Sequence, residues 1–292
     1  MISYSGTVIR PPSEADSLIL QITLGCSDNA CIFCPAYKDK KFKIKDIKEI
    51  ESDIEKAGRY YPYVRKVFLA DGDALIIPQK DLIRIFDKII SVFKHVSRIS
   101  LYASVKSIEL KTQDELKELR ARKMSLVYIG FETGDEQVYR LIKKYGSAEQ
   151  NAGAVIKLKE AAIKSNVTVI LGLGGNKFSL QHASNTALIL NKAKPEQIAA
   201  LTLMVAKNTP LYEMCLKKEF EIVKEFGILK ELKTIIEKLE DFPCLFFSNH
   251  ASNYVPISAR FPKDRQNIIN MLNKVIEQSD KSMLRNDFLR TL

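Results

Sequence analysis

The chain has 292 residues and is 46% hydrophobic, enough to bury the core of one large domain or of one domain with a small appendage. Its longest apolar runs fall far short of the roughly 18–20 residues that cross a membrane. Its N-terminus lacks the basic start and apolar stretch of a signal peptide. We therefore expect a soluble, cytoplasmic protein with no membrane partner. Lys and Arg number 45 against 35 Asp and Glu, a net charge of +10. A lysine-rich surface is the simpler explanation, and an anionic partner such as RNA is the other.

Short apolar runs alternate with amphipathic stretches up to Tyr212. Six runs are rich in Val, Ile and Leu without strict alternation, which is typical of parallel strands buried on both faces. They are Leu18–Leu24, Lys66–Ala70, Arg98–Ala103, Ser125–Phe131, Val167–Leu173 and Ala199–Met204. Helical spacing marks the stretches between them, namely Asp46–Gly58, Gln79–Phe93, Thr112–Arg122, Ala148–Ser165 and Leu180–Lys192.

Strand–helix units in series predict an α/β fold with a parallel sheet and right-handed crossovers. The sheet is either doubly wound or an open six-stranded relative of the eightfold barrel, and in both the chemistry lies at the C-terminal ends of the strands. After Tyr212 we expect helices over Glu213–Glu225, Ile228–Leu239 and Lys263–Gln278, and a strand over Phe242–Phe247. This divides the chain into an N-terminal arm (1–17), a core barrel (18–212) and a short, mostly helical extension (213–292) that packs on the barrel.

Three of the five cysteines, Cys26, Cys31 and Cys34, follow the first predicted strand within nine residues. Clustered cysteines in a cytosolic chain indicate metal binding rather than disulfides. Close thiolates suit zinc or an iron–sulfur cluster. A structural zinc site would need a fourth ligand nearby, whereas the next cysteine is Cys215 and the nearest histidine is His95. Three ligands favour an iron–sulfur cluster with one open iron; zinc and buried, unligated cysteines are the alternatives.

With Phe33 directly before the last cysteine, this segment resembles the radical S-adenosylmethionine (SAM) superfamily, whose signature is C-x3-C-x-aromatic-C. The first gap here has four residues instead of three. The resemblance implies a partial (β/α)6 TIM-like barrel in which the three cysteines bind a [4Fe–4S] cluster. It also implies that SAM chelates the fourth iron and that Phe33 packs near the adenine.

The resemblance implies a reaction as well. The cluster cleaves SAM reductively to a 5′-deoxyadenosyl radical, which abstracts hydrogen from the substrate. Such a cluster is oxygen-sensitive and needs a low-potential electron donor such as ferredoxin or flavodoxin.

Two further segments resemble the superfamily in the first half of the chain. Asp71-Gly72-Asp73-Ala74 follows the second predicted strand, where the superfamily has G-G-E-P and its backbone meets the SAM amino group. Gly72 and Asp73 are thus candidate cofactor contacts, and an ordinary turn is the alternative. Ser104 follows the third strand, where a polar SAM contact often lies; a helix-capping serine is the equal alternative.

Later segments continue the resemblance. Gly130–Gly134 is similar to the G-x-E-S-G segment of methylthiotransferase-like and coproporphyrinogen-dehydrogenase-like members, so Glu132 is a candidate acceptor for a SAM ribose hydroxyl or ammonium group. Alternatively, it bonds to the N-terminus of the next helix. Leu171 and Gly172 belong to a glycine-rich segment like the one whose backbone lies along the adenine. Met204 ends the sixth predicted strand and is a further cofactor candidate.

The polar loop Ser248–Tyr254 supplies the best remaining substrate candidates, Asn249, His250 and Asn253. A histidine there could bind an anion or transfer a proton, or the loop is structural and its asparagines bond to its own backbone. Asp71 and Tyr102 are further candidates. We expect Cys215 and Cys244 to be core residues, and place His95 and His182 on helices without a role.

Three functions remain open for a chain with these features. The chain is short for an added cobalamin domain and has no second cysteine cluster, which favours a small-molecule or cofactor-precursor substrate. Modification of RNA or protein comes second, on account of the net charge of +10, with nucleic acid the less favoured partner. A non-catalytic iron–sulfur or haem-handling protein on the same fold is third. The basic stretch Lys38–Lys45 is a candidate approach site for an anionic substrate or a reductant.

Overall fold

The computed structural model of the chain describes residues 2–291. Met1 and Leu292, the outermost residues of the predicted arm and extension, lie outside the described residues. The chain forms two compact units. The first contains the chain up to Asn29, Ala36–Ile129 and Ile156–Ser165. The second contains Ala30–Pro35, Gly130–Val155 and the chain from Asn166 onward.

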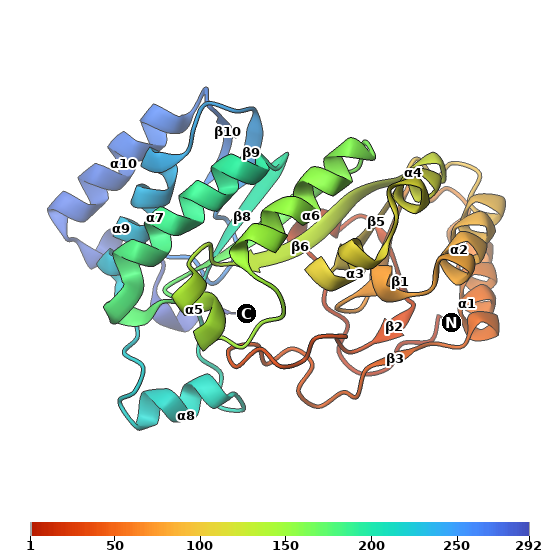
Figure 1. Cartoon of the computed structure of the whole chain (residues 1–292), viewed down its shortest axis with the longest axis horizontal. Helices are drawn as coiled ribbons and strands as arrows, with labels where there is room; N and C mark the ends of the chain where they lie inside the picture. Colours follow the sequence, from red (N-terminus) through yellow and green to blue (C-terminus); the bar gives the residue numbers. More distant parts are fainter. Residues whose placement is uncertain (1, 292) are drawn as a thin grey trace. The chain divides into compact units, whose positions relative to one another are not determined.

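All six strands predicted for the core form, as does the strand predicted over Phe242–Phe247, and one strand that was not predicted, Ser258–Phe261, extends the sheet. Hydrogen-bonded neighbours follow the order β1-β4-β5-β6-β7-β8-β9-β10 (Figure 1). Their bounds are Leu18–Gln21, Lys66–Ala70, Arg98–Ala103, Met124–Glu132, Lys164–Leu171, Gln197–Thr202, Cys244–Phe247 and Ser258–Phe261. Strands β1, β4, β5 and β6 are parallel, as are β7, β8 and β9, whereas β10 pairs antiparallel with β9. This confirms the α/β class with the mostly parallel sheet of a partial TIM-like barrel. The sheet has eight strands rather than six because the extension adds β9 and β10.

In the first unit, α1 (Ile47–Tyr60) and α2 (Gln79–Val92) pack side by side (Figure 1). Helix α1 begins at Asp46, whose side chain accepts from the Lys48 and Glu49 backbone N–H groups, as an N-cap should. The short helices α3 (Val105–Leu110) and α4 (Gln113–Ala121) follow. Strands β2 (Thr23–Leu24) and β3 (Lys43–Ile44) form a separate antiparallel pair, so the predicted first strand is interrupted at Ile22.

The N-terminal arm is an integral part of the first unit. The short 3-10 helix Pro12–Glu14 carries the fully buried Glu14. Its carboxylate accepts hydrogen bonds from Arg98 at 2.8 Å, Ser100 at 3.0 Å and the Tyr128 hydroxyl at 2.6 Å. Because a buried carboxylate needs such partners, these contacts fix the arm against β5 and β6.

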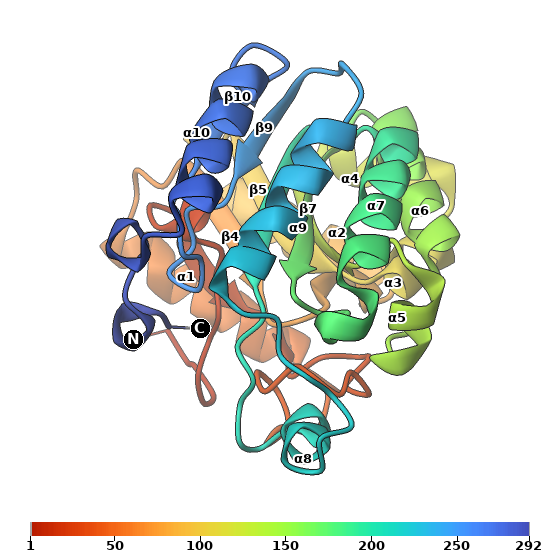
Figure 2. The same cartoon turned by 90° about the vertical axis from the view of Figure 1, so that its left-hand side faces the viewer.

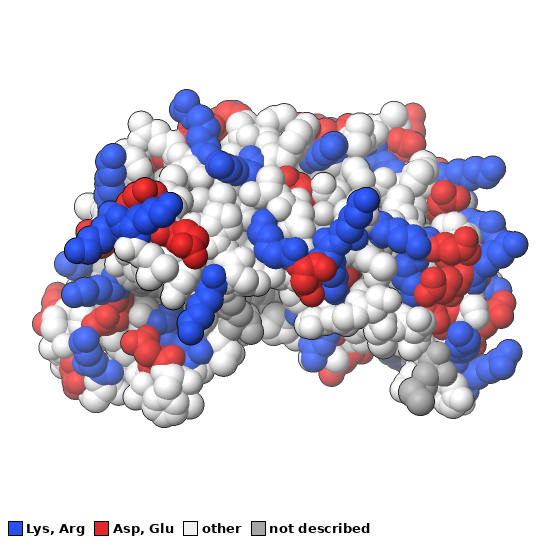
Figure 3. All heavy atoms as spheres, turned by 90° about the horizontal axis from the view of Figure 1, so that it is seen from below, with Lys and Arg blue, Asp and Glu red and all other residues white. Residues whose placement is uncertain are grey.

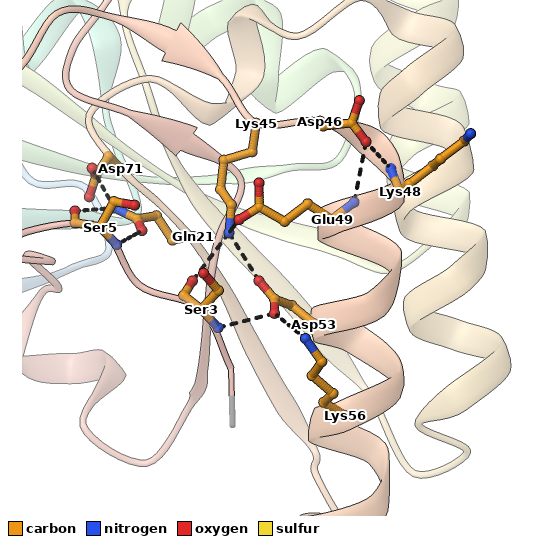
Figure 4. A network of polar contacts seen from close by, with 10 residues as sticks. All are labelled: Ser3, Ser5, Gln21, Lys45, Asp46, Lys48, Glu49, Asp53, Lys56 and Asp71. Carbon is orange, nitrogen blue, oxygen red and sulfur yellow. Dashed lines mark hydrogen bonds and ion pairs between the residues drawn. The ribbon is translucent and has the colours of Figure 1, made fainter.

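The arm also binds part of the lysine-rich stretch, including Lys45 (Figure 4). The buried Lys45 pairs with Asp53 at 2.9 Å and donates to the Ser3 carbonyl. Lys40 donates to the Thr7 carbonyl, and Lys38 donates to the Asn29 carbonyl. Only Lys41 and Lys43 of this stretch are exposed. The predicted approach site thus consists of two lysines rather than five.

The second unit contains α5 (Glu136–Leu141), α7 (Gly175–Ala193), α8 (Pro210–Leu216), α9 (Glu225–Lys238) and α10 (Arg265–Gln278). Helix α6 (Ala148–Glu160) has residues in both units. Helix α9 lies between α7 and α10 (Figure 2). The helix expected over Glu213–Glu225 is wrong beyond Leu216, because Lys218 adopts a positive φ of 60° and the chain turns there. The extension joins the sheet through β8 and β9; the domain boundaries at 17 and 212 stay a prediction.

Basic and acidic side chains are interspersed on the face in Figure 3 rather than gathered into one patch. This agrees with the lysine-rich surface expected from composition. Among residues 2–291, no helix is long and apolar enough to cross a membrane.

Candidate active site

Cys26 lies against the turn that follows β4. The Gly72 N–H donates to the Gly25 carbonyl at 3.1 Å. A Cβ atom at Gly72 would come within 2.9 Å of the Cys26 Cβ and of the Tyr37 ring. Only glycine therefore lets the two turns approach so closely. The sequence-predicted Gly72 and the first cysteine are thus neighbours.

Asp73 and Ser104, predicted separately, contact each other directly. The fully buried Asp73 carboxylate accepts from the Ser104 backbone N–H at 3.1 Å, from its hydroxyl at 2.7 Å and from the Ser27 hydroxyl. Burial raises the pKa of Asp73. Ser104 also caps α3, since its hydroxyl accepts from the Ser107 N–H at 3.0 Å. Ser104 thus combines the capping role with a contact to the turn beside Cys26.

Asp71 has a buried carboxylate with one satisfied and one unsatisfied oxygen (Figure 4). Its Oδ2 accepts from Gln21 at 3.0 Å and from the Gly25 N–H at 3.2 Å, with the Lys40 ammonium 3.6 Å away. Its Oδ1 has no hydrogen-bond partner among the described residues. Because buried acceptors are normally satisfied, Oδ1 is a site for a donor from water or a bound molecule.

Cys31 and Cys34 belong to the second unit, in an apolar environment. Cys31, Ile32 and Phe33 pack with Leu173 and Leu203, and Cys34 packs against this cluster. The Ile32 N–H donates to the Ile142 carbonyl at 3.0 Å, and its carbonyl accepts from the Leu211 N–H at 3.1 Å. These bonds hold the cysteine loop from both sides. Phe33 is buried, as the predicted packing role requires.

Glu132 ends β6 in a strained conformation, with a positive φ of 64°. Its side chain folds back over Gly130, where a Cβ would lie 2.0 Å from the Glu132 Oε1. The N-terminus of α5 is capped by Asp135, which accepts from the Gln137 and Val138 N–H groups at 3.0 Å. Glu132 therefore does not serve as that helix cap, the alternative considered for it.

Lys144, which sequence reasoning left without a role, pairs with Glu132 at 3.1 Å. Burial would lower the pKa of Lys144, but the charges of Glu132 and Cys31 outweigh burial and raise it. Lys144 thus lies in the combined field of a predicted cluster ligand and a predicted SAM contact. In the sequence it looks like half of a surface Lys143-Lys144 pair, so only the fold reveals it.

The turn after β7 is held by a residue from α9. Gly172 has a positive φ of 82°, and its N–H donates to the Glu231 Oε2 at 2.6 Å. The other Glu231 oxygen accepts from the Ser179 hydroxyl at 2.6 Å. Glu231 is fully buried, and burial raises its pKa to about 7. No sequence pattern indicated Glu231, because it looks like an ordinary helix glutamate.

His182, also without a predicted role, completes this network. Its Nε2 lies 3.1 Å from the Ile170 carbonyl and 3.9 Å from the Glu231 carboxylate. Its Nδ1 lies 2.8 Å from the Thr133 hydroxyl. Burial lowers the pKa of His182 to about 4, so the ring is neutral near pH 7. A neutral ring that donates through Nε2 and accepts through Nδ1 satisfies both contacts.

The substrate candidates of the 248–254 loop have different environments. Asn253 is buried, donates to the Ala200 carbonyl at 2.8 Å and accepts from the Thr202 hydroxyl at 2.8 Å, so it closes the end of β8. His250 accepts the Ser252 N–H on Nδ1, so Nε2 carries the hydrogen in the neutral ring. Burial lowers the pKa of His250. Asn249 is exposed.

The remaining candidates are placed as follows. Met204 is partly buried just beyond β8, and Leu171 is the buried last residue of β7. Tyr102 packs edge-on against Phe68 within the first unit. Cys244 is buried on β9, where burial raises its pKa to about 11.

Comparison with known proteins gives a family match for much of the chain. Residues 20–185 match the family model described as the radical SAM superfamily. An uncharacterized protein of Methanocaldococcus jannaschii is 24% identical over 274 residues, which cover 88% of this chain and 82% of that protein.

Several solved structures share the fold. Methylornithine synthase aligns with a TM-score of 0.54 at 14% identity, over 76% of this chain and 63% of its own. The Methanocaldococcus infernus Elp3 protein with an N-terminal deletion gives 0.54 at 14%, over 90% and 63%. The cobalamin-dependent SAM radical enzyme OxsB, with aqua-cobalamin and SAM bound, gives 0.57 at 14%, over 90% and 46%. The chain spans less than two thirds of the length of each of these structures.

Proposed function

The chain belongs to the radical SAM superfamily, and from this premise we propose that Cys26, Cys31 and Cys34 hold its iron–sulfur cluster. Enzymes of this superfamily use a [4Fe–4S] cluster and SAM, and these are the cofactors of this enzyme. When bound, the cluster donates an electron that cleaves SAM to a 5′-deoxyadenosyl radical, which removes hydrogen from a substrate. The protein supplies binding, orientation and exclusion of water.

Among the described residues, no three potential metal ligands lie together in one group, so the support for this pair of cofactors comes from individual features of each unit. Gly72 leaves its backbone open directly beside Cys26, where a side chain would clash. Cys31 and Phe33 lie among packed apolar side chains, which would keep water away from an iron–sulfur cluster bound there. Three thiolates without a fourth protein ligand in the motif leave one iron for SAM.

The ion pair between Lys144 and Glu132 is the main support for the proposal. The Lys144–Glu132 ion pair, at 3.1 Å, lies close enough to Cys31 for the thiolate to raise the pKa of Lys144. A paired carboxylate and ammonium beside a cluster ligand suit a zwitterionic amino acid with a ribose, which is what SAM presents. In this role Glu132 accepts from a ribose hydroxyl or the ammonium group, and Lys144 orients Glu132.

Backbone groups complete the proposed SAM site. Gly72 and Asp73 present backbone to the amino group of SAM, and Ser104 holds the Asp73 side chain. Leu171, Gly172 and Met204 line the adenine, with the Gly172 turn held by Glu231.

For the reaction, we propose hydrogen abstraction from a polar small molecule or cofactor precursor. The His250 Nε2 donor and the unsatisfied Asp71 Oδ1 acceptor support a polar substrate. Asn249 is a weaker candidate contact, and the two buried hydrogen bonds of the Asn253 amide favour a structural role for it. An RNA-modifying reaction is the second candidate, supported by the surface described below.

Fractionation of a cell extract tests the substrate class. The anaerobically reconstituted enzyme with dithionite and SAM receives either the ultrafiltrate of small molecules or the retained macromolecules of the extract, and 5′-deoxyadenosine is measured. We expect the ultrafiltrate to raise the rate several-fold. Stimulation by the macromolecular fraction alone, abolished by ribonuclease, would replace the small-molecule proposal with RNA modification.

A further inference from the structure

The last residue of α1 and the loop between α1 and β4 carry three exposed aromatic side chains. Tyr60, Tyr61 and Tyr63 are 70%, 56% and 79% exposed. They line a surface groove together with Asp16, Pro62, Val64, Arg65 and Lys66. Tyrosine rings normally bury much of their surface, so three such rings in one short segment form an unusual surface.

Further aromatic residues extend this surface. The Tyr63 ring centroid lies 5.7 Å from that of His95, which is exposed in the turn after α2 rather than on a helix as expected. Tyr4 is 47% exposed, and its proximity to Tyr61 contributes to raising its pKa, though burial contributes more. Tyr4 also lines an adjacent groove with Val8 and Arg10.

Within residues 2–291, the positive charges at this surface form no ion pairs with carboxylates, although the charge of Arg59 contributes, after that of Lys88, to lowering the pKa of Glu55. Arg59, Arg65, Lys66 and Lys94 form no ion pair among the residues described. By contrast, cations on the neighbouring α2 and β5 are paired, as in Arg84–Glu51, Lys88–Glu55 and Arg98–Glu14. Asp16 is the one carboxylate that lines the described groove. The surface is therefore basic as well as aromatic.

We propose that this aromatic–basic surface, formed by Tyr4, Tyr60, Tyr61, Tyr63, His95, Arg10, Arg59, Arg65, Lys66 and Lys94, binds single-stranded nucleic acid. Exposed aromatic rings stack on bases without regard to sequence, and neighbouring cations contact the phosphates. An acidic protein is the weaker occupant, since the groove exposes no Leu, Ile, Met or Phe side chain for the apolar core of a protein interface.

The loop that carries Tyr61 and Tyr63 lies apart from the proposed SAM site. Lys66 begins β4 and Arg98 begins β5, whereas Gly72 and Ser104 follow the other ends of the same parallel strands. Nucleic acid bound here is therefore anchored rather than placed at the reacting atoms. The proposal does not depend on which reaction the enzyme catalyses.

Fluorescence anisotropy with a labelled, mixed-sequence single-stranded RNA tests the proposal on the reconstituted full-length protein. For four phosphate contacts on a single strand, we expect log Kd to rise with log salt at a slope of about 3, or about fiftyfold between about 50 and 200 mM. The triple variant Tyr60→Ala/Tyr61→Ala/Tyr63→Ala should bind about tenfold more weakly or worse, with the slope unchanged. The double variant Arg59→Glu/Arg65→Glu should lower the slope by about 1.4.

Matched controls use exposed residues elsewhere, Phe288→Ala for the ring and Lys274→Glu for the charge; both should bind as the wild type does. Circular dichroism and iron content establish that each variant is folded. Absence of wild-type binding, or equal weakening by the control variants, would overturn the proposal. The proposal would also be overturned if poly-L-glutamate competed as well as unlabelled RNA and bound the triple tyrosine variant as tightly as the wild type. An acidic protein would then be the occupant.

Discussion

At the scale of single residues, Glu132 adopts a left-handed backbone conformation although it is not a glycine. A non-glycine residue with positive φ costs on the order of 1–3 kcal/mol, and such strain tends to persist at functional sites. Here the φ of 64° turns the Glu132 carboxylate back over Gly130 toward Lys144. The strained backbone and the ion pair thus both hold the Glu132 carboxylate in a fixed position beside Cys31.

Lys144→Met should weaken SAM binding more than it slows turnover. A charge-assisted hydrogen bond contributes about 1.5–3 kcal/mol, so we expect the KM for SAM to rise by about tenfold or more. The neighbouring Lys143→Met is the matched control, since Lys143 is exposed. Equal KM values for the two variants would contradict the role given to Lys144.

The sequence identifies site residues that carry a motif and misses those that act through space. Gly72, Asp73, Ser104 and Glu132 were found because each follows a strand in a recognisable segment. Lys144 and Glu231 reach the site from helical segments without a motif, so nothing in their local sequence distinguishes them. Ser104 shows a further limit, because its capping and site contacts coexist and the pattern treats them as alternatives.

At the scale of elements, α9 supports the turn after β7. Glu231 satisfies the Gly172 N–H, and the Ile228 side chain lies 2.7 Å from where a Gly172 Cβ would be. This helix lies beyond residues 20–185 that match the family model. The proposed adenine contact therefore depends on an element outside the residues that match the family model.

Glu231→Ala should destabilise the fold and raise the KM for SAM together. It leaves the buried Gly172 N–H without an acceptor, at about 1–3 kcal/mol, and the partly buried Ser179 hydroxyl without its partner. Glu231→Gln keeps an acceptor for Gly172 and should restore both the melting temperature and the KM. Failure of the glutamine variant to restore KM while stability recovers would contradict the positioning role.

The wild type and Glu231→Gln should also differ in how their stability depends on pH. The pKa of Glu231 is about 7 when folded against a usual 4.5, so its neutral form favours the folded state. That contribution is complete below pH 4.5 and is lost as the pH rises through about 7. We expect the wild-type free energy of unfolding, relative to Glu231→Gln, to fall across this window. Urea denaturation at several pH values measures this difference, to which His182, 3.9 Å from the Glu231 carboxylate, also contributes.

The N-terminal arm is the element least visible in the sequence. Its attachment through Ser3, Lys45 and Asp53 involves polar residues far apart in the chain, which periodicity does not register (Figure 4). The strands, in contrast, were placed within a few residues because buried apolar runs mark them. Short helices such as α3 and α5, with six residues each, lack the span for helical periodicity to appear.

Lys45→Met should destabilise the protein by about 1.5–3 kcal/mol, because the buried Asp53 carboxylate loses its buried cation and keeps only the Ser3 N–H at 3.0 Å and Lys56 at 3.7 Å. Lys43→Met, in the same stretch but exposed, should change stability by less than about 0.5 kcal/mol. Chemical denaturation of the two variants measures the difference. Similar midpoints would show that the arm is not held by this ion pair.

At the scale of the whole molecule, the net charge of +10 has no single location. Most lysines of the Lys38–Lys45 stretch are used internally, and charges of both signs mix on the face in Figure 3. The uncompensated cations instead gather beside exposed tyrosines in the first unit. Composition alone indicated an anionic partner but not where it binds, because which cations are paired with carboxylates depends on the fold.

The central claim is that this chain cleaves SAM with a cluster held by three cysteines. The most direct test is anaerobic reconstitution with iron and sulfide, addition of dithionite and SAM, and an assay for 5′-deoxyadenosine. The wild type and Cys215→Ala, which alters a cysteine outside the motif, should form the product, and Cys31→Ala should form none. Product formation by Cys31→Ala at the wild-type rate, or none by a wild type that carries its full complement of iron and binds SAM, would contradict the account.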